Sequence, residues 1–180
     1  IPAAIVGFIF GDYIDILLDN VIIVAISLVI GGVILIFVDN WFKSPSKKQE
    51  VTYLKAFKIG CFQIIAMIPG VSRSAATIIG GLTQKLTRKN AAEFSFFLAV
   101  PTMFAASAYK LFKSYNHINN KDLGILIMGN IIAFFVAMLA IRSFVTYLTK
   151  HGFRIFGYYR IVVGLIIIIL YILGFELKVV

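Results

Sequence analysis

Long apolar stretches alternate with short polar ones along almost the whole chain. A helix needs about 20 mostly apolar residues to cross a lipid bilayer, and four segments have this character, at 21–38, 94–112, 123–148 and 155–175. Residues 1–11 are equally apolar but too few to cross, so we interpret them as the end of a span that begins upstream. The pattern predicts an all-α membrane protein, a polytopic helix bundle. We expect residues 1–180 to form one integral membrane domain, the C-terminal portion of a longer protein.

A polar break interrupts the apolar segment 56–86. Pro69 and Gly70 lie in the middle of it and disfavour a continuous helix there. The two halves form either one long broken span or a re-entrant helix-loop-helix that returns to the side it came from. Basic residues favour cytoplasmic loops, and they occur in both flanking loops, 39–58 and 85–89, which favours the re-entrant hairpin. We expect a cavity beside the tip of this hairpin, because non-helical backbone at membrane depth is tolerated only within protein or beside water.

Four polar residues follow the break, namely Ser72, Arg73, Ser74 and Thr77. A charged side chain at membrane depth costs roughly 2.5–3.5 kcal/mol, so we expect this arginine to have a function. A helix that starts after Gly70 points its first, unpaired N–H groups into the break. Such N–H groups, hydroxyls and a guanidinium together bind phosphate well, and Arg73 can make the bidentate contact.

We therefore predict an anion site at this break, in which one hydroxyl could act as a nucleophile if a base lay near it. The alternative is that Ser72 or Ser74 only caps a helix while Arg73 extends to the membrane surface. The pattern does not separate hydrolysis from transport, since half-helix N-termini bind anions in transporters as well.

Other polar residues have simpler interpretations. Gln63 precedes the break and either faces the cavity or bonds to a neighbouring helix. Asn90 and Glu93 have the spacing of a capping box, with a role for Glu93 in the site as the alternative. Arg160 lies near the end of a span and is expected to extend toward the membrane surface. Asn130 is expected to form a hydrogen bond across helices.

Composition supports the membrane assignment and limits the partners. Hydrophobic residues make up 61% of the chain and its mean hydropathy is +0.97, whereas soluble domains average about 45–50% apolar residues. A net charge of +9 would suggest nucleic acid in a soluble protein. Here the basic residues crowd short loops, where they favour anionic membrane lipids, and we expect no nucleic-acid partner.

Four segments together carry a family resemblance. They are Gly-Cys-Phe-Gln at 60–63, Pro-Gly-Val-Ser-Arg-Ser-Ala-Ala-Thr-Ile at 69–78, Glu-Phe-Ser-Phe at 93–96 and Leu-Ala-Val-Pro at 98–101. With these motifs the chain resembles the undecaprenyl-diphosphate phosphatases, also called bacitracin resistance proteins. The resemblance covers most of the chain.

The resemblance implies a hydrolase that converts undecaprenyl diphosphate to undecaprenyl phosphate and phosphate, recycling the lipid carrier for peptidoglycan synthesis. It implies a multi-pass protein of the bacterial inner membrane, with its site facing the periplasm, an inverted-repeat fold with re-entrant hairpins, and a possible homodimer. By resemblance, Arg73 binds the diphosphate and Ser72, Ser74 and Thr77 supply the hydroxyls around it. Gly70 and Gln63 complete the predicted substrate-binding residues.

Two departures from the family pattern matter. Ala75 stands where the family usually has glycine, a mild change at a helix start. The family's other motif, with two glutamates and a Ser-Ser-Thr-Gly-His run, is not in this sequence, and the resemblance places it upstream. That motif is expected to supply the nucleophile or base and the ligands of a divalent cation, Mg or Ca. We expect no metal site within these residues and no catalysis by them alone. A transporter or flippase of a phosphorylated polyprenyl lipid, or a scaffold without activity, is the alternative.

Overall fold

The structure is a computed structural model that describes residues 2–18, 20–43, 45–114 and 120–175. Over these residues every regular element is a helix, which confirms the all-α prediction. In chain order they are α1 (Pro2–Leu18), α2 (Val21–Trp41), α3 (Tyr53–Ile65), α4 (Arg73–Thr83), α5 (Arg88–Ser114), α6 (Asn120–His151) and α7 (Arg154–Ile172).

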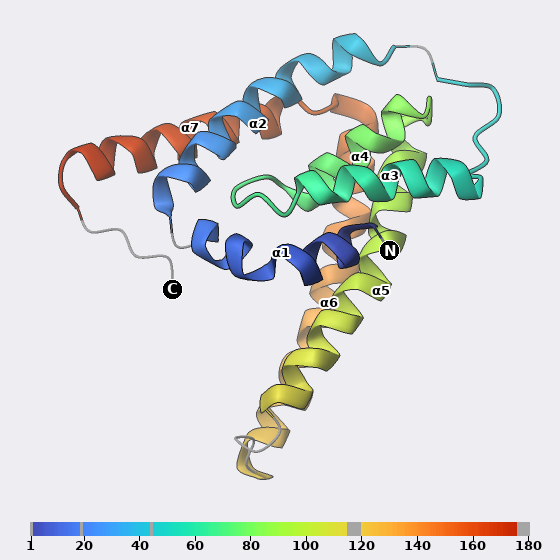
Figure 1. Cartoon of the computed structure of the whole chain (residues 1–180). Helices are drawn as coiled ribbons and strands as arrows, with labels where there is room; N and C mark the ends of the chain where they lie inside the picture. The colour runs from blue at the N-terminus through green and yellow to red at the C-terminus, as the bar shows by residue number, and fades with distance from the viewer. Residues whose placement is uncertain (1, 19, 44, 115–119, 176–180) are drawn as a thin grey trace.

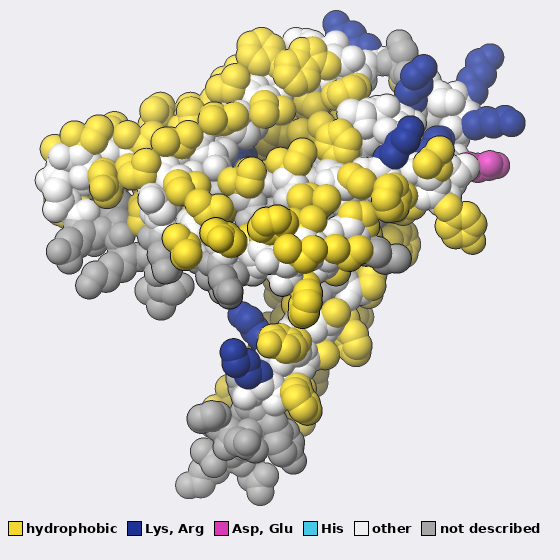
Figure 2. All heavy atoms as spheres, viewed as in Figure 1, with side chains coloured by type: hydrophobic (Ala, Val, Ile, Leu, Met, Phe, Trp, Pro, Cys, Tyr) yellow, Lys and Arg dark blue, Asp and Glu magenta, His cyan; other side chains and the backbone are white. Residues whose placement is uncertain are grey.

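Four of these helices are long and apolar enough to cross a membrane, and each overlaps one predicted span. They are Val21–Trp41, Arg88–Lys113, Leu123–His151 and Arg154–Ile172. Apolar side chains cover much of the molecular surface, while lysines and arginines gather around the end of the molecule where α3 begins (Figure 2). This distribution is the one expected of a multi-pass membrane protein, in which lipid contacts the apolar surface.

The first helix is longer than predicted. It extends to Leu18 instead of ending near Gly11, and Phe10 has non-helical backbone angles (φ −111°, ψ 17°) that mark a kink. The aspartates at positions 12 and 15 end the apolar run in the sequence. They do not end the helix, because a change of hydropathy does not by itself break helical hydrogen bonding.

The broken segment forms a helical hairpin. α3 runs to a tip over residues 66–72, and α4 returns beside it (Figure 1). The Thr52 hydroxyl oxygen caps α3 by accepting from the Lys55 N–H at 3.4 Å. The predicted break is therefore a helix-turn-helix, whereas its re-entrant position in a membrane and its place in an inverted repeat stay predictions.

Glycines bring α2 and α7 into close contact along their length (Figure 1). A Cβ added to Gly32 would lie 2.7 Å from the Gly157 carbonyl oxygen, and one added to Gly157 would lie 2.7 Å from the Gly32 carbonyl oxygen. Further along the same crossing, a Cβ on Gly164 would lie 2.9 Å from the Ala25 carbonyl oxygen. Small residues at such a crossing allow the two backbones to approach, so α7 has a fixed position on α2.

A buried cluster lies where the hairpin meets α2, α5 and α6. Its members come from five helices and two connecting turns: Leu35, Val38, Ile59, Ile78, Leu82, Leu86, Ala91, Ala92, Leu148 and Phe153. Beyond it, α5 and α6 project together as a long arm (Figure 1). On this arm Asn130 donates to the Leu126 carbonyl of its own helix at 2.7 Å, so the predicted bond across helices is wrong.

Asp39 joins three helix ends near this cluster. Its Oδ2 accepts from the Phe153 N–H at 2.8 Å, just before α7. Its Oδ1 lies 2.7 Å from Nη2 of Arg88, the first residue of α5. Gly152 has φ +77°, and a Cβ there would collide with the Asp39 carboxylate. One carboxylate at the end of α2 therefore fixes where α5 and α7 begin.

We predict that Asp39→Ala lowers the free energy of unfolding by about 1–3 kcal/mol, because the buried Phe153 N–H loses its acceptor. Unfolding in detergent is the measurement. Glu93→Gln is the control, since the Lys89–Glu93 pair is 3.8 Å long and solvent-exposed and such pairs contribute about 0–1 kcal/mol. Equal losses in the two variants would contradict the role given to Asp39.

Candidate anion-binding site

The hairpin tip is built from a tight turn. The Val71 N–H donates to the Ile68 carbonyl at 3.0 Å, and Gly70 between them has φ +83°. Proline at the second position and glycine at the third are the residues that a type II turn favours. A Cβ on Gly70 would also collide with the Val24 carbonyl of α2. Both the turn and its contact with α2 therefore require glycine at this position.

Ser72 ends the turn and starts α4. Its backbone is extended (φ −67°, ψ 124°), and its Oγ accepts from the Ala75 N–H at 3.2 Å. The Ser72 and Ser74 hydroxyls lie 3.2 Å apart. The sequence left open whether Ser72 caps a helix, and the structure shows that it does. The cap does not exclude a binding role, because both hydroxyls also line a cavity.

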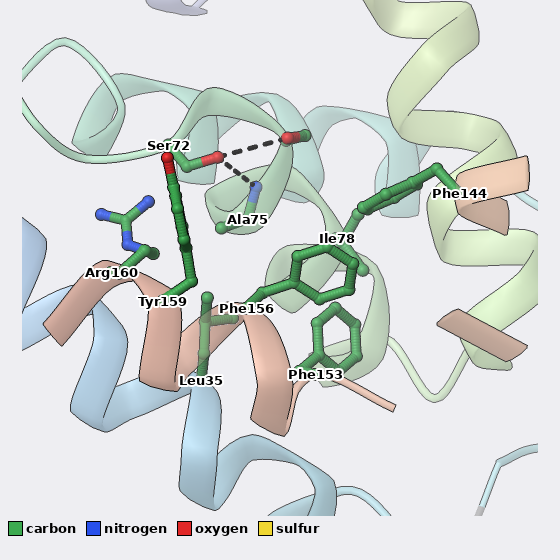
Figure 3. Close-up of a pocket in the computed structure, with 10 residues that line it drawn as sticks. Leu35, Ser72, Ala75, Ile78, Phe144, Phe153, Phe156, Tyr159 and Arg160 are labelled. Atoms are coloured by element: carbon green, nitrogen blue, oxygen red, sulfur yellow. Dashed lines mark hydrogen bonds between the residues drawn. The ribbon is translucent and has the colours of Figure 1, made fainter. Parts of the chain in front are cut away.

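This cavity has a volume of about 200 Å³ and lies between the hairpin and α7. Its polar lining consists of Ser72, Ser74, Tyr159 and Arg160. Figure 3 shows Ser72, Tyr159 and Arg160 toward one end and the phenylalanine rings toward the other. The apolar lining residues are Leu35, Ala75, Ile78, Phe144, Phe153 and Phe156. The space is therefore amphipathic, with hydrogen-bond donors at the tip of the hairpin.

Arg160 does not extend to the membrane surface as the sequence suggested. It is only 9% exposed, and its Nη2 donates to the Gly70 carbonyl at 2.6 Å. Gly31 leaves room for it, since a Cβ there would lie 2.7 Å from Nη2. The close crossing of α2 and α7 turns this face of α7 inward. The sequence held one signal for this, because Gly157, Arg160 and Gly164 share a helix face at spacings of three and four.

Arg73 and Thr77 do not line this cavity. Thr77 is fully buried, and its Oγ1 is 2.6 Å from the Ser95 Oγ on α5. Arg73 is partly buried, and its Nη1 has no hydrogen-bond partner within the described part of the chain. The structure thus separates the four predicted residues into two pairs, and their predicted roles stay predictions.

A second, apolar cavity of about 380 Å³ lies between α2, α3 and α4. It shares Leu35, Ser72, Ala75 and Arg160 with the first cavity, so the two cavities lie next to each other. Its walls include the apolar residues Ile30, Ile34, Phe62, Ile65, Ile68 and Ile79. Gln63 is buried on α3 but lines neither of these cavities.

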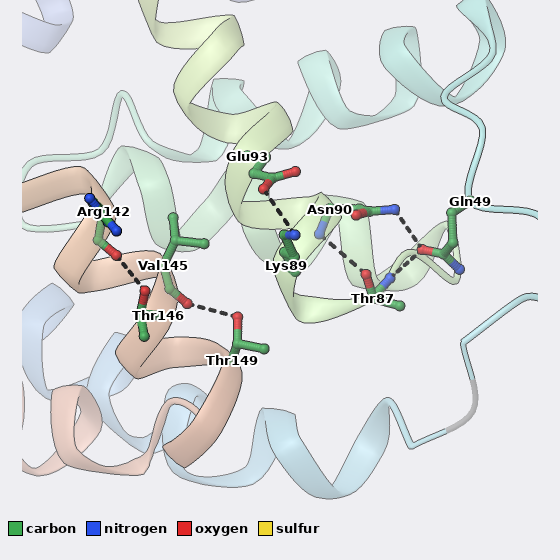
Figure 4. A network of polar contacts seen from close by, with 9 residues as sticks. All are labelled: Gln49, Thr87, Lys89, Asn90, Glu93, Arg142, Val145, Thr146 and Thr149. Atoms are coloured by element: carbon green, nitrogen blue, oxygen red, sulfur yellow. Dashed lines mark hydrogen bonds and ion pairs between the residues drawn. The ribbon is translucent and has the colours of Figure 1, made fainter. Parts of the chain in front are cut away.

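Glu93 lies away from this site, and it is not part of a capping box with Asn90. The Thr87 hydroxyl accepts from the Asn90 N–H at 3.2 Å, so Thr87 is the cap of α5. Gln49 supports this start by accepting from the Thr87 N–H at 2.7 Å. Glu93 instead pairs with Lys89 one turn before it (Figure 4). The prediction was wrong because threonine three residues earlier provides an equivalent cap.

The described residues contain no group of three or more His, Cys, Asp or Glu side chains that could hold a metal ion. The divalent cation implied by the family resemblance therefore does not fit the side chains present in this part of the protein. The expectation that its ligands lie upstream stays a prediction.

Comparison with known proteins identifies the family. The family model described as Bacitracin resistance protein BacA matches residues 1–166, and the chain belongs to this family. Three relatives carry the name undecaprenyl-diphosphatase. They are from Flavobacterium johnsoniae (53% identity, covering 95% of this chain and 67% of the relative), Bdellovibrio bacteriovorus (52%, covering 100% and 70%) and Porphyromonas gingivalis (50%, covering 99% and 65%). The chain spans about two thirds of the length of these relatives.

We predict that Thr77→Val destabilises the fold by about 1–3 kcal/mol, because the buried Ser95 hydroxyl loses its partner. Adding Ser95→Ala to this variant should recover part of the loss, since the unpaired Ser95 hydroxyl is then removed as well. Unfolding of the single and double variants in detergent measures the coupling. Thr146→Val is the control, because its hydroxyl only donates to the carbonyl of Arg142 on the exposed side of α6. Strictly additive losses would contradict the pairing.

Proposed function

We propose that this chain forms the diphosphate-binding part of an enzyme that hydrolyses undecaprenyl diphosphate to undecaprenyl phosphate and phosphate. The observation that carries the proposal is the hairpin tip, where two hydroxyls, a helix N-terminus and two arginines gather in an otherwise apolar helical protein. The names of the relatives support this substrate. In a bacterium the reaction would recycle the lipid carrier for the cell wall and confer bacitracin resistance.

The residues of the tip act on the diphosphate by binding it. The first N–H groups of α4 and the positive end of its dipole favour an anion. The Arg73 guanidinium suits two phosphate oxygens at once and would stabilise charge that develops on the bridging oxygen as the phosphorus–oxygen bond breaks. The Ser74 hydroxyl adds a donor. Attack on the phosphorus is assigned to residues upstream, because the described residues place no carboxylate among the lining of the two cavities.

The membrane setting belongs to the same proposal. The apolar surface of the spans and the apolar cavity would hold the prenyl tail, while membrane lipids surround the helices. We place the protein in the bacterial inner membrane with the site open to the periplasmic side, and a homodimer is compatible with this arrangement. These statements rest on the family resemblance together with the charge distribution of the loops.

Phosphate release from a prenyl diphosphate in vesicles tests the function. We compare the present chain with a longer one, in which it follows the upstream sequence of the Flavobacterium johnsoniae relative. Release by the longer chain alone is expected, because the attacking groups lie upstream. Release by the present chain would place the chemistry at Ser72–Thr77. Lipid movement across the bilayer with no release from either chain would identify a flippase and overturn the proposal.

Arg73→Lys in the longer chain should reduce turnover roughly 10²-fold, since loss of one donor to a developing oxyanion typically costs about this much and lysine cannot replace a bidentate contact. The measurement is the rate of phosphate release at saturating substrate. Arg142→Lys on the exposed side of α6 is the matched control and should keep full activity. Near-normal turnover of Arg73→Lys would remove Arg73 from the site.

A further inference from the structure

The charge of Arg160 has no carboxylate partner in the described part of the chain, where the ion pairs are Arg88–Asp39 and Lys89–Glu93. The side chain is only 9% exposed, and its Nε is buried without a hydrogen-bond partner among these residues. A buried cation costs much free energy unless an anion and hydrogen bonds compensate it. The arrangement therefore calls for an anion beside Arg160.

The guanidinium is held in place for such an anion. Its Nη2 donates to the Gly70 carbonyl, and Gly31 of α2 lies against the same nitrogen. These contacts fix the plane of the group and leave Nε unused. A planar guanidinium with a free edge matches the spacing of two phosphoryl oxygens.

The surroundings of Arg160 supply further donors. Ser72, Ser74 and Tyr159 line the same cavity, and the hydroxyls of Ser72 and Tyr159 lie toward the Arg160 end of it (Figure 3). The volume of about 200 Å³ is several times the roughly 30 Å³ that one water occupies in the liquid. Hydroxyls around a cation favour a group made of several oxygens, and the apolar remainder of the cavity favours a ligand with an apolar part.

We propose that this cavity is a second phosphoryl-binding subsite, in which Arg160 binds one phosphoryl group with Ser72, Ser74 and Tyr159. It rests on the proposed function and extends it, because Arg73 does not line this cavity and is left to contact another phosphoryl group. A diphosphate offers two such groups. The occupant of the Arg160 subsite is either the phosphoryl group attached to the lipid or the phosphate that is released.

The adjoining apolar cavity favours a lipid-attached group. It shares Ser72 and Arg160 with the subsite, so apolar walls suited to a lipid chain lie directly beside the bound phosphoryl group. Released phosphate has no apolar part that could contact this second cavity. Titration with a prenyl phosphate and with inorganic phosphate separates these two sources of the same chemical group.

The test is calorimetric titration of the detergent-solubilised chain with inorganic phosphate and, separately, with farnesyl monophosphate. Arg160→Met should weaken binding roughly 10-fold or more, because it removes a charged hydrogen-bond donor. Methionine keeps an unbranched side chain in its place. Tyr159→Phe should weaken it roughly 3-fold, the effect of one neutral hydrogen bond. Arg142→Met is the matched control and should bind as the unchanged chain does, since Arg142 is exposed on α6.

Weakening for farnesyl monophosphate identifies the lipid-attached group, and weakening for inorganic phosphate alone identifies the released one. Equal affinities in Arg160→Met, Tyr159→Phe and Arg142→Met overturn the subsite. If Arg160→Met does not fold, Tyr159→Phe and Ser74→Ala decide the question, because neither removes a buried charge. Loss of phosphate binding in the longer chain would show that an upstream carboxylate pairs with Arg160, which also overturns it.

The proposed function can fail separately from the subsite. Absence of phosphate release by the longer chain would refute the proposed enzymatic activity, while Arg160-dependent binding of phosphate would still establish the subsite. In an active longer chain, Arg160→Met should raise KM for the prenyl diphosphate by the same factor as it weakens phosphoryl binding. A change in thermal stability without a change in KM would show that Arg160 has only a structural role.

Discussion

The close crossing of α2 and α7 is the contact on which the rest of the site depends. Gly32 and Gly157 allow the two backbones to touch, and this contact turns Arg160 toward the hairpin tip. Gly70 of that tip packs on the same helix, against Val24. α2 therefore supports both Arg160 and the turn at Gly70 that Arg160 contacts. Any side chain added along this crossing would separate the two parts of the site.

Much of the fold follows from hydropathy and from a few residues with strong local preferences. Apolar runs of membrane-spanning length predict the four long helices, because a continuous apolar run and a continuous helix have similar limits there. Pro69 and Gly70 predict the hairpin, since the turn they form favours proline at its second position and requires glycine at its third. The extent of α1 and the cap at Thr87 were missed because hydropathy does not mark helix ends, and more than one hydroxyl residue can cap a helix.

The site was predicted only in part, for a reason that lies in tertiary packing. Ser72 and Ser74 are adjacent in sequence to the break, so local reasoning finds them. Arg160 is 90 residues from Gly70, and only the pairing of α2 with α7 brings it there. Thr77 carries a hydroxyl as the site serines do, yet its position on α4 places that hydroxyl against Ser95. Residue type alone therefore cannot separate lining residues from packing residues.

The cap at the start of α4 has a consequence for selectivity among lipid head groups. Because the Ser72 oxygen accepts from the Ala75 N–H, the cap already uses one of the two lone pairs of this hydroxyl. The guanidinium of Arg160 and the first N–H groups of α4 are donors. The polar end of the cavity is therefore rich in donors and carries the positive charge of Arg160. An ammonium at the end of a lipid head group would meet the like charge of Arg160 there, so the cavity favours head groups that end in a phosphoryl group over those that end in an ammonium.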